Sequence, residues 1–111
     1  MIARFWSAQT TPAHARAYAD HLRTHVLPAL KRIDGYAGAM LLEREASGGI
    51  ELMVITWWRS LEAVRGFAGP DLDVAIVADE AASWLTRYDR RVRHYELMIE
   101  DADPARMEGQ A

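Results

Sequence analysis

The sequence predicts an α+β fold, and two observations support this prediction. Three segments carry apolar residues on both faces of an alternating pattern, which is typical of strands buried on both sides of a sheet; they are Tyr36–Ala46, Gly49–Trp58 and residues 91–100. The rest of the chain offers two stretches for helices, residues 12–33 and 60–86. These helices suffice to cover one face of a four-stranded sheet, so the other face needs a different cover.

The uncovered sheet face predicts a homodimer. Trp57 and Trp58 point to opposite faces, because the side chains of a strand alternate. At most one of them can therefore face the helices, and the other is expected at an interface, where tryptophan is enriched. A closed two-fold pair is the commonest assembly of soluble proteins. We therefore expect two copies of the chain to join sheet to sheet.

The amino-terminal part predicts a strand followed by a long helix. Residues 2–8 alternate as a strand does, and Thr11-Pro12 supplies a hydroxyl N-cap and a proline at the first helical position. Apolar residues then recur at three- and four-residue steps, as on one face of a helix. Pro28 removes a backbone hydrogen bond, so we expect a kink or a break in this helix near residues 25–27.

Turns separate the central strands from the helix and from each other. Asp34-Gly35 is expected to end the first helix, because glycine adopts the left-handed cap conformation. Ser47-Gly48-Gly49 is expected to form a tight hairpin between the second and third strands.

The second helical stretch predicts several short pieces. Ser60 supplies an N-cap and Glu62 lies favourably in the first turn. Gly66, and then Gly69-Pro70, are expected to break the helix. Short helical pieces capped by aspartates are expected to follow, from Asp71 through Val77 and from Asp79 through Leu85.

The last strand completes a strand-helix-strand-strand-helix-strand order, which is the ferredoxin-like arrangement with an antiparallel sheet. It is expected to run over residues 91–100, so that residues 1–100 form one domain. Residues 101–111 contain Pro104 and Gly109 and little apolar content, and we expect a disordered tail there.

Composition excludes several classes of function. The chain has 111 residues and a net charge of -3, with a pI of about 5.8, and therefore lacks the basic footprint of a nucleic-acid-binding protein. It contains no cysteine, so disulfides and thiolate chemistry do not arise. No apolar run has the length of a signal peptide or a membrane span. A cytoplasmic protein without membrane contact is the resulting expectation.

Five short segments within residues 1–100 resemble the antibiotic biosynthesis monooxygenase-like family of dimeric α+β barrel proteins. They are His25-Val26-Leu27-Pro28, Gly35-Tyr36, Thr56-Trp57-Trp58-Arg59-Ser60, Phe67-Ala68-Gly69-Pro70-Asp71 and Val92-Arg93-His94-Tyr95-Glu96. The resemblance implies a dimeric barrel with a pocket between helices and sheet. Enzymes of this family oxidise phenolic polyketide precursors to quinones with dioxygen, without flavin, heme or metal. It therefore implies a small aromatic substrate and no cofactor.

The family pattern is only partly kept. Trp58-Arg59-Ser60 matches the W-x-S motif of the family's active site. However, Val54 stands where those enzymes carry asparagine, and Val64 where they carry tyrosine, and valine cannot hydrogen-bond an enolate or a peroxide. In the heme-degrading branch, the position of the iron-ligating histidine corresponds to Val77, which disfavours heme degradation.

Two functional hypotheses therefore stay open, and with them the question of whether the chain is an enzyme. The first is a cofactor-independent monooxygenase that oxidises a small aromatic or polyketide-like substrate with dioxygen. The second is a non-catalytic dimeric module that binds a small apolar metabolite, which the valines at the family's polar positions favour.

Candidate site residues follow from the same pattern. His94 lies on a strand expected to line the pocket, where an imidazole can accept a phenolic proton near neutral pH; the alternative is a hydrogen bond within the dimer interface. Trp58 is expected to shape the pocket, with a purely structural core role as the alternative. Further candidates for substrate contacts are Tyr18, Tyr36, Phe67 and His25.

No metal site is predicted. His14, Tyr18, His21 and His25 share one face of the first helix, and the last two histidines have the i, i+4 spacing of helical zinc ligands. The spacing indicates no third ligand, so solvated or rim histidines are the favoured interpretation.

Overall fold

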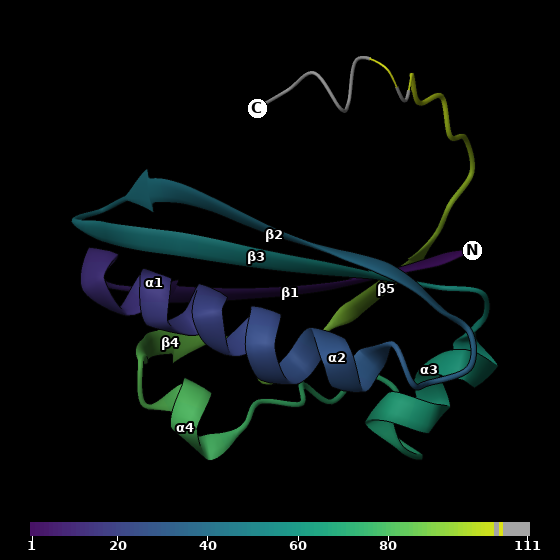
Figure 1. The fold of residues 1–111 in the computed structure, drawn as a ribbon, viewed down its shortest axis with the longest axis horizontal. Helices are drawn as coiled ribbons and strands as arrows, with labels where there is room; N and C mark the ends of the chain where they lie inside the picture. Colours follow the sequence, from purple (N-terminus) through teal and green to yellow (C-terminus); the bar gives the residue numbers. More distant parts are fainter. Residues whose placement is uncertain (104, 106–111) are drawn as a thin grey trace.

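The computed structural model describes residues 1–103 and 105, and it places the helices on one side of a single sheet (Figure 1). The strands are β1 (Ile2–Thr10), β2 (Tyr36–Ala46), β3 (Gly49–Trp58), β4 (Leu85–Tyr88) and β5 (Arg93–Glu96). The helical elements are α1 (Pro12–His21), the π-helical segment η1 (Leu22–Val26), α2 (Leu27–Leu30), α3 (Leu61–Ala68) and α4 (Asp79–Ala82).

The sheet has the ferredoxin-like order that the sequence predicts. Its order is β2-β3-β1, with β4 and β5 both paired to the remaining edge of β1, and every pairing is antiparallel. The predicted bounds of β2 and β3 are confirmed, as is the hairpin between them, where Ser47 and Gly48 have φ angles of 45° and 80°. β1 continues to Thr10.

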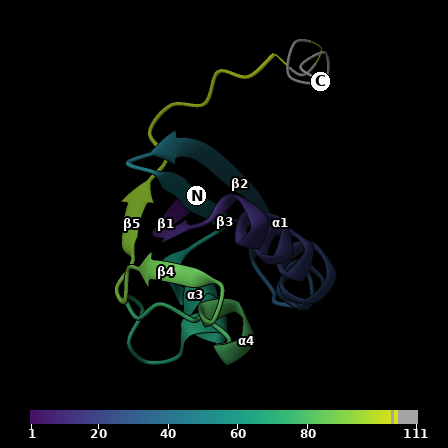
Figure 2. The ribbon, with the colours of Figure 1, turned by 90° about the vertical axis from the view of Figure 1, so that its left-hand side faces the viewer.

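The prediction of a single last strand over residues 91–100 is wrong, because the chain forms two short strands separated by a detour (Figure 2). After β4 the backbone turns away from β1 and pairs with the segment before α4. The amide of Ala75 donates to the carbonyl of Arg90 at 2.9 Å, and that of Val92 donates to the carbonyl of Asp73 at 2.8 Å. β5 then rejoins β1 and ends at Glu96.

The predicted long helix after β1 forms as three contiguous elements, α1, η1 and α2. Thr11 accepts a hydrogen bond from the amide of His14 at 3.3 Å, and Pro12 is the first helical residue. No break occurs before Pro28, because the chain stays helical from Pro12 to Leu30; the α-helical pattern instead changes to the π-helical segment η1, which ends at Val26. The helix ends at Leu30, four residues before the predicted cap at Asp34-Gly35; Gly35 does have a left-handed φ of 92°, but in the turn before β2.

The region after β3 differs from the prediction at three points. Ser60 caps α3 as expected, but Gly66 lies inside this helix, which ends at Ala68 with Gly69 as its C-cap. The predicted helix from Asp71 is absent from the described structure, because the Asp71 carboxylate accepts the amide of Asp73 at 3.1 Å in a local turn. Asp79 is the first residue of α4 rather than its cap, and residue 85 begins β4. Of the predicted tail, residues 104 and 106–111 lie outside the described residues.

The helix-facing side of the sheet holds the core. Trp58 and Val64 have no exposed surface, and Leu52 is 1% exposed. The Trp58 ring stacks on Phe67 with centroids 5.8 Å apart, and its indole nitrogen donates to the Thr56 hydroxyl at 2.8 Å. Trp57 points to the opposite face, as predicted.

That opposite side, here called the open face, carries apolar side chains that no described helix covers (Figure 1). Its members come from four strands, since residues at alternate positions share a face; they are Phe5, Met40, Leu42, Met53, Ile55, Trp57 and Tyr95. Met40, Leu42 and Tyr95 are 45%, 48% and 50% exposed. Within residues 1–103 and 105, no helix has the length and apolar character needed to cross a membrane.

We predict that Trp58→Ala lowers the free energy of unfolding by about 3–5 kcal/mol, because it leaves a large cavity beneath the sheet. Trp58→Phe should cost less, since it keeps most of the apolar contact with Phe67. Urea unfolding followed by circular dichroism measures both. A loss below about 1 kcal/mol for the alanine variant would contradict the central packing role of this residue.

Candidate functional site

A cavity of about 70 Å³ lies between the sheet and the helices. Most of its wall is apolar, and four side chains with polar groups interrupt it besides the indole of Trp6: Arg4, Tyr18, His21 and Thr56. Arg4 and Thr56 rise from the sheet, where they are direct partners on β1 and β3. The other two come from α1. Such a mainly apolar cavity with a few convergent polar groups is the usual form of a small-molecule site.

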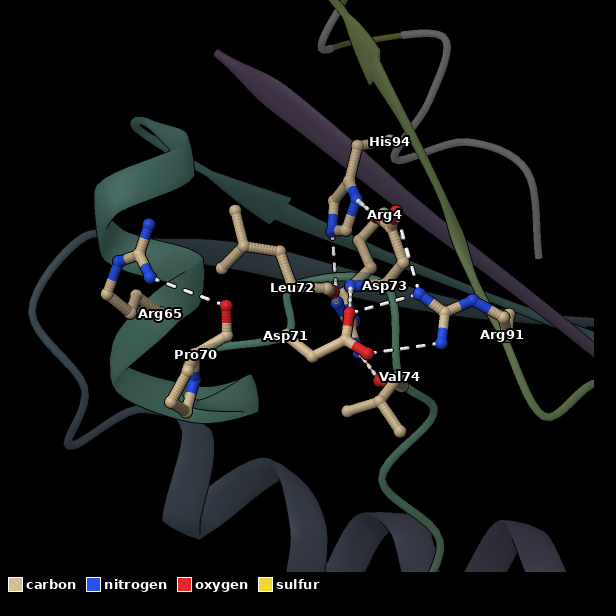
Figure 3. Close-up of polar contacts among 9 residues, drawn as sticks. All are labelled: Arg4, Arg65, Pro70, Asp71, Leu72, Asp73, Val74, Arg91 and His94. Carbon is tan, nitrogen blue, oxygen red and sulfur yellow. Dashed lines mark hydrogen bonds and ion pairs between the residues drawn. The ribbon is translucent and has the colours of Figure 1, made fainter.

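Arg4 places a positive charge in the wall of this cavity. It is 4% exposed. Its guanidinium donates to the carbonyls of Leu72 at 2.5 Å and Val74 at 2.6 Å (Figure 3). It also lies over the Phe67 ring, 5.4 Å from the centroid. Burial lowers the pKa of Arg4, and the nearby Asp73 carboxylate opposes this effect, but an arginine remains charged at any physiological pH.

His94 lies behind Arg4 and is absent from the cavity wall. Its Nε2 is 3.0 Å from the Arg4 guanidinium and its Nδ1 is 3.1 Å from the Asp73 carboxylate (Figure 3). Because arginine can only donate, Nε2 accepts, and the hydrogen-bond network assigns the proton to Nδ1, which donates to Asp73. Burial and then the Arg4 charge lower the pKa of His94, while Asp73 opposes them. The neutral imidazole therefore holds the arginine in place.

An ion pair secures the segment that Arg4 binds. Arg91 donates to both carboxylate oxygens of Asp71, at 3.1 and 3.0 Å (Figure 3). This pair lowers the pKa of Asp71 and raises that of Arg91. Together with the backbone bonds around Asp73, it fastens one end of the loop between α3 and α4 to the sheet edge. The other end, residues 76–78, lines the cavity.

The prediction of solvated or rim histidines is wrong for His21, which is 9% exposed and lines the cavity. Its ring lies 5.7 Å from Trp84 and 5.3 Å from His25, between centroids. Its Nδ1 is buried and has no hydrogen-bond partner among the described residues. These residues also contain no group of three or more histidine, cysteine, aspartate or glutamate side chains that could hold a metal ion.

Tyr18 lies one helical turn before His21 and also lines the cavity. Its ring stacks on Trp6 with centroids 5.9 Å apart. Burial raises the pKa of Tyr18 to about 12, so its phenol remains protonated near neutral pH and can donate a hydrogen bond.

The structure brings some of the predicted site residues together and separates others. Tyr18 and Phe67 line the cavity. Trp58 lies behind Phe67, Tyr36 packs edge-on against Trp58 at 5.5 Å, and His25 lies beside His21, so none of these three is on the wall. The family roles that the sequence suggests for Trp58 and His94 stay predictions.

Two of the valines that replace polar family residues belong to the cavity, whereas the third does not. Val54 and Val77 line it, and Val64 is buried in the cluster around Trp58. Sequence reasoning missed Arg4, Thr56 and the burial of His21. The sequence contains a signal for Arg4. In the alternating pattern of β1 this residue lies on the same face as Ile2 and Trp6, which are buried in the core.

No protein-family model and no curated protein matches the chain. Solved structures do match it. A Bacillus cereus protein described as a candidate antibiotic biosynthesis monooxygenase has a TM-score of 0.62 at 13% identity, over 92% of this chain and 97% of that one. A monooxygenase from the gene ActVA-Orf6 of Streptomyces coelicolor, in complex with nanaomycin D, has a TM-score of 0.57 at 17% identity, over 92% and 89%. The heme-degrader MhuD from Mycobacterium tuberculosis, with two hemes bound in its active site, has a TM-score of 0.59 at 23% identity, over 92% and 100%.

These likenesses define the class of fold. The chain has the α+β fold of the antibiotic biosynthesis monooxygenase-like proteins, which confirms the resemblance that the sequence predicts. At these identities the likeness concerns the fold, and function has to be argued from the cavity itself.

We predict that His94 makes the stability of the protein depend on pH. Its pKa in the folded state is lowered, so the unfolded chain takes up this proton first, at about pH 6.5. The stabilisation is therefore complete above about pH 6.5 and is lost as the pH falls toward the folded-state pKa. The groups that face the imidazole are Arg4 and Asp73.

The test compares melting temperatures of wild type and His94→Gln between about pH 7.5 and about pH 5.5. Glutamine offers an acceptor to Arg4 but does not titrate, so its melting temperature should fall less steeply with pH than that of the wild type. Parallel curves for the two proteins would show that His94 does not contribute to the pH dependence.

Proposed function

We propose that this protein is a cofactor-independent monooxygenase that oxidises a small hydroxyaryl compound with dioxygen in the cavity. The observation that carries the proposal is the buried Arg4 cation in an otherwise mainly apolar wall. A nearby positive charge in a site of low polarity lowers the pKa of a bound phenol. The resulting phenolate is the electron-rich form that reacts with dioxygen. The names of two structural neighbours, a monooxygenase and a heme-degrader, are consistent with oxidative chemistry on this fold.

The reaction can be written for the probe 1-naphthol. The phenolate passes one electron to dioxygen, and the two radicals join through a new carbon–oxygen bond at the position para to the phenolate oxygen. The proton that the phenol lost moves to the outer oxygen of this peroxide. Loss of the para carbon's proton and cleavage of the oxygen–oxygen bond then release water and leave 1,4-naphthoquinone. One atom of dioxygen enters the quinone and the other leaves as water, so the dioxygen accepts all four electrons that the naphthol loses.

Each polar residue has a place in this proposal. Arg4 stabilises the phenolate, as preorganised cationic groups do at developing negative charge. His94, the base that the sequence suggested, acts through Arg4, because its Nε2 lone pair already accepts from the guanidinium. Trp58 supports the ring of Phe67 from behind and so helps to position the aromatic wall.

The size of the cavity sets a condition on binding. Its volume of about 70 Å³ is smaller than the roughly 150 Å³ of an engineered protein cavity that holds benzene. An aromatic ligand therefore has to displace part of the wall. Ile76 lines the cavity and is nevertheless 50% exposed, so we propose that residues 76–78 move outward to admit it. Heme is much larger than these ligands, and we do not propose it as a substrate.

We predict dioxygen uptake with 1-naphthol in buffer that contains a metal chelator and no flavin. Arg4→Met should lower the rate about 100-fold, because it removes the charge that stabilises the phenolate. Arg23→Met is the matched control, since this arginine lies on the surface in an exposed pair with Asp20. An oxygen electrode measures the rate, and labelled dioxygen should place one heavy oxygen in the quinone. Uptake no faster than with heat-denatured protein would contradict the proposal.

The second candidate is a non-catalytic binding module. Val54 favours it, since this residue lines the cavity at the position where the family's enzymes carry asparagine. Calorimetric binding of 1-naphthol under anaerobic conditions, together with no oxidation in air, would select this function.

We further propose that the protein is a homodimer joined through the open face. A contiguous exposed apolar patch on a soluble protein marks an interaction site, and the open face carries Phe5, Trp57 and Tyr95 as well as aliphatic residues. A second copy supplies a complementary surface by two-fold symmetry, which closes the assembly. The two sheets would then form the barrel that the sequence suggested.

We predict that Leu42→Glu dissociates this dimer, because it buries an unpaired charge in the interface. Leu61→Glu is the matched control: Leu61 is 45% exposed, close to the 48% of Leu42, but lies on α3. Sedimentation velocity should show dimeric wild type, a dimeric control and a monomeric Leu42→Glu variant. A monomeric wild type at micromolar concentration would contradict the homodimer.

A further inference from the structure

The Nδ1 atom of His21 is buried without a hydrogen-bond partner among the described residues, and a polar group of a bound ligand can supply that partner. His21 is 9% exposed, lines the cavity from α1 and has a buried Nδ1 without a hydrogen-bond partner among the described residues. Native proteins pair nearly all of their buried polar groups, so each exception needs a physical explanation. The rings that surround His21, those of Trp84 and His25, contact it through their faces and edges and supply no hydrogen bond.

The sheet side of the cavity is different, because its polar groups already have partners. The Arg4 guanidinium is held by two backbone carbonyls and His94. The Thr56 hydroxyl accepts from the Trp58 indole. The cavity therefore has a cationic group on its sheet side, and on its helix side it is lined by His21, whose buried Nδ1 is unpaired among the described residues.

We propose that the ligand is a planar aromatic compound with two oxygen groups, and that its second hydroxyl donates a hydrogen bond to His21 Nδ1. The proposal rests on the proposed function, in which Arg4 binds the first oxygen as a phenolate. A neutral imidazole with its proton on Nε2 presents the Nδ1 lone pair as an acceptor. His21 is then a specificity-determining residue, because a site with a buried acceptor discriminates against analogues that lack the donor.

The test is a binding comparison by calorimetry without dioxygen, so that it does not depend on turnover. The probes are 1-naphthol and its 1,5-, 1,6- and 1,7-dihydroxy relatives, each also with the second hydroxyl methylated. For the wild type, at least one dihydroxy compound should bind roughly five- to tenfold more tightly than 1-naphthol, as one additional hydrogen bond predicts. Its methyl ether should lose this advantage.

Two variants assign the advantage to His21. His21→Phe keeps the bulk of the ring and removes the acceptor, so the preference for the dihydroxy compound should disappear. His21→Asn places an amide oxygen close to the position of Nδ1 and should retain it. His14→Phe is the matched control on the same helix, where His14 is exposed. Melting temperatures establish that all three variants are folded.

The outcomes separate this inference from the proposed function. A preference that persists in His21→Phe, or a wild type that prefers none of the dihydroxy compounds, overturns the role of His21. If the preference depends on His21 but no dihydroxy compound consumes dioxygen, the inference holds and the monooxygenase proposal fails. If 1-naphthol is oxidised while His21 has no effect on binding, the inference fails alone.

Discussion

The burial of the Arg4 charge is the constraint on which the cavity depends. A guanidinium beneath a sheet is costly unless its donors are satisfied, and here the acceptors are backbone carbonyls of Leu72 and Val74 and the neutral ring of His94. The loop after α3 therefore has to lie against β1, and His94 has to be deprotonated. One side chain thus links the sheet, the loop and a titratable group (Figure 3).

Much of the fold could be predicted from the sequence, because alternation and helical periodicity report directly which face of an element is buried. Such patterns predict β2, β3 and the long helix formed by α1, η1 and α2. The two edge strands could not be predicted, since the apolar residues of 85–96 are Leu85, Tyr88, Val92 and Tyr95, three or four positions apart, and this spacing is not the alternation that marks a strand. Their separation depends on backbone bonds to Asp73 and Ala75, and no local pattern reports such pairing.

The residues of the candidate site were harder to predict from the sequence, for a related reason. Arg4 contacts residues 68, 70 and 90 positions away along the chain, and spacing within a motif does not encode such contacts. A charge in a strand is also usually solvated, as is a histidine beside the apolar stripe of a helix. Residues from the family motif, such as Trp58 and Tyr36, instead lie one layer behind the wall. Sequence similarity thus located the neighbourhood of the cavity and Phe67 in its wall, but not the polar groups of Arg4, Thr56 and His21.

The backbone bonds between residues 73–75 and 90–92 also determine how the cavity can open. They bind one end of the loop to the sheet edge in the manner of an additional short strand. The lining residues 76–78 follow immediately and have no such bonds to β1 in the described pairings. The loop is thus fastened at one end, and in the proposed outward movement of residues 76–78 the backbone would turn at Ala75, the last residue held by these bonds. In that movement the cavity would open on the side of α4, while the hydrogen bonds of Arg4 would keep its own side in place.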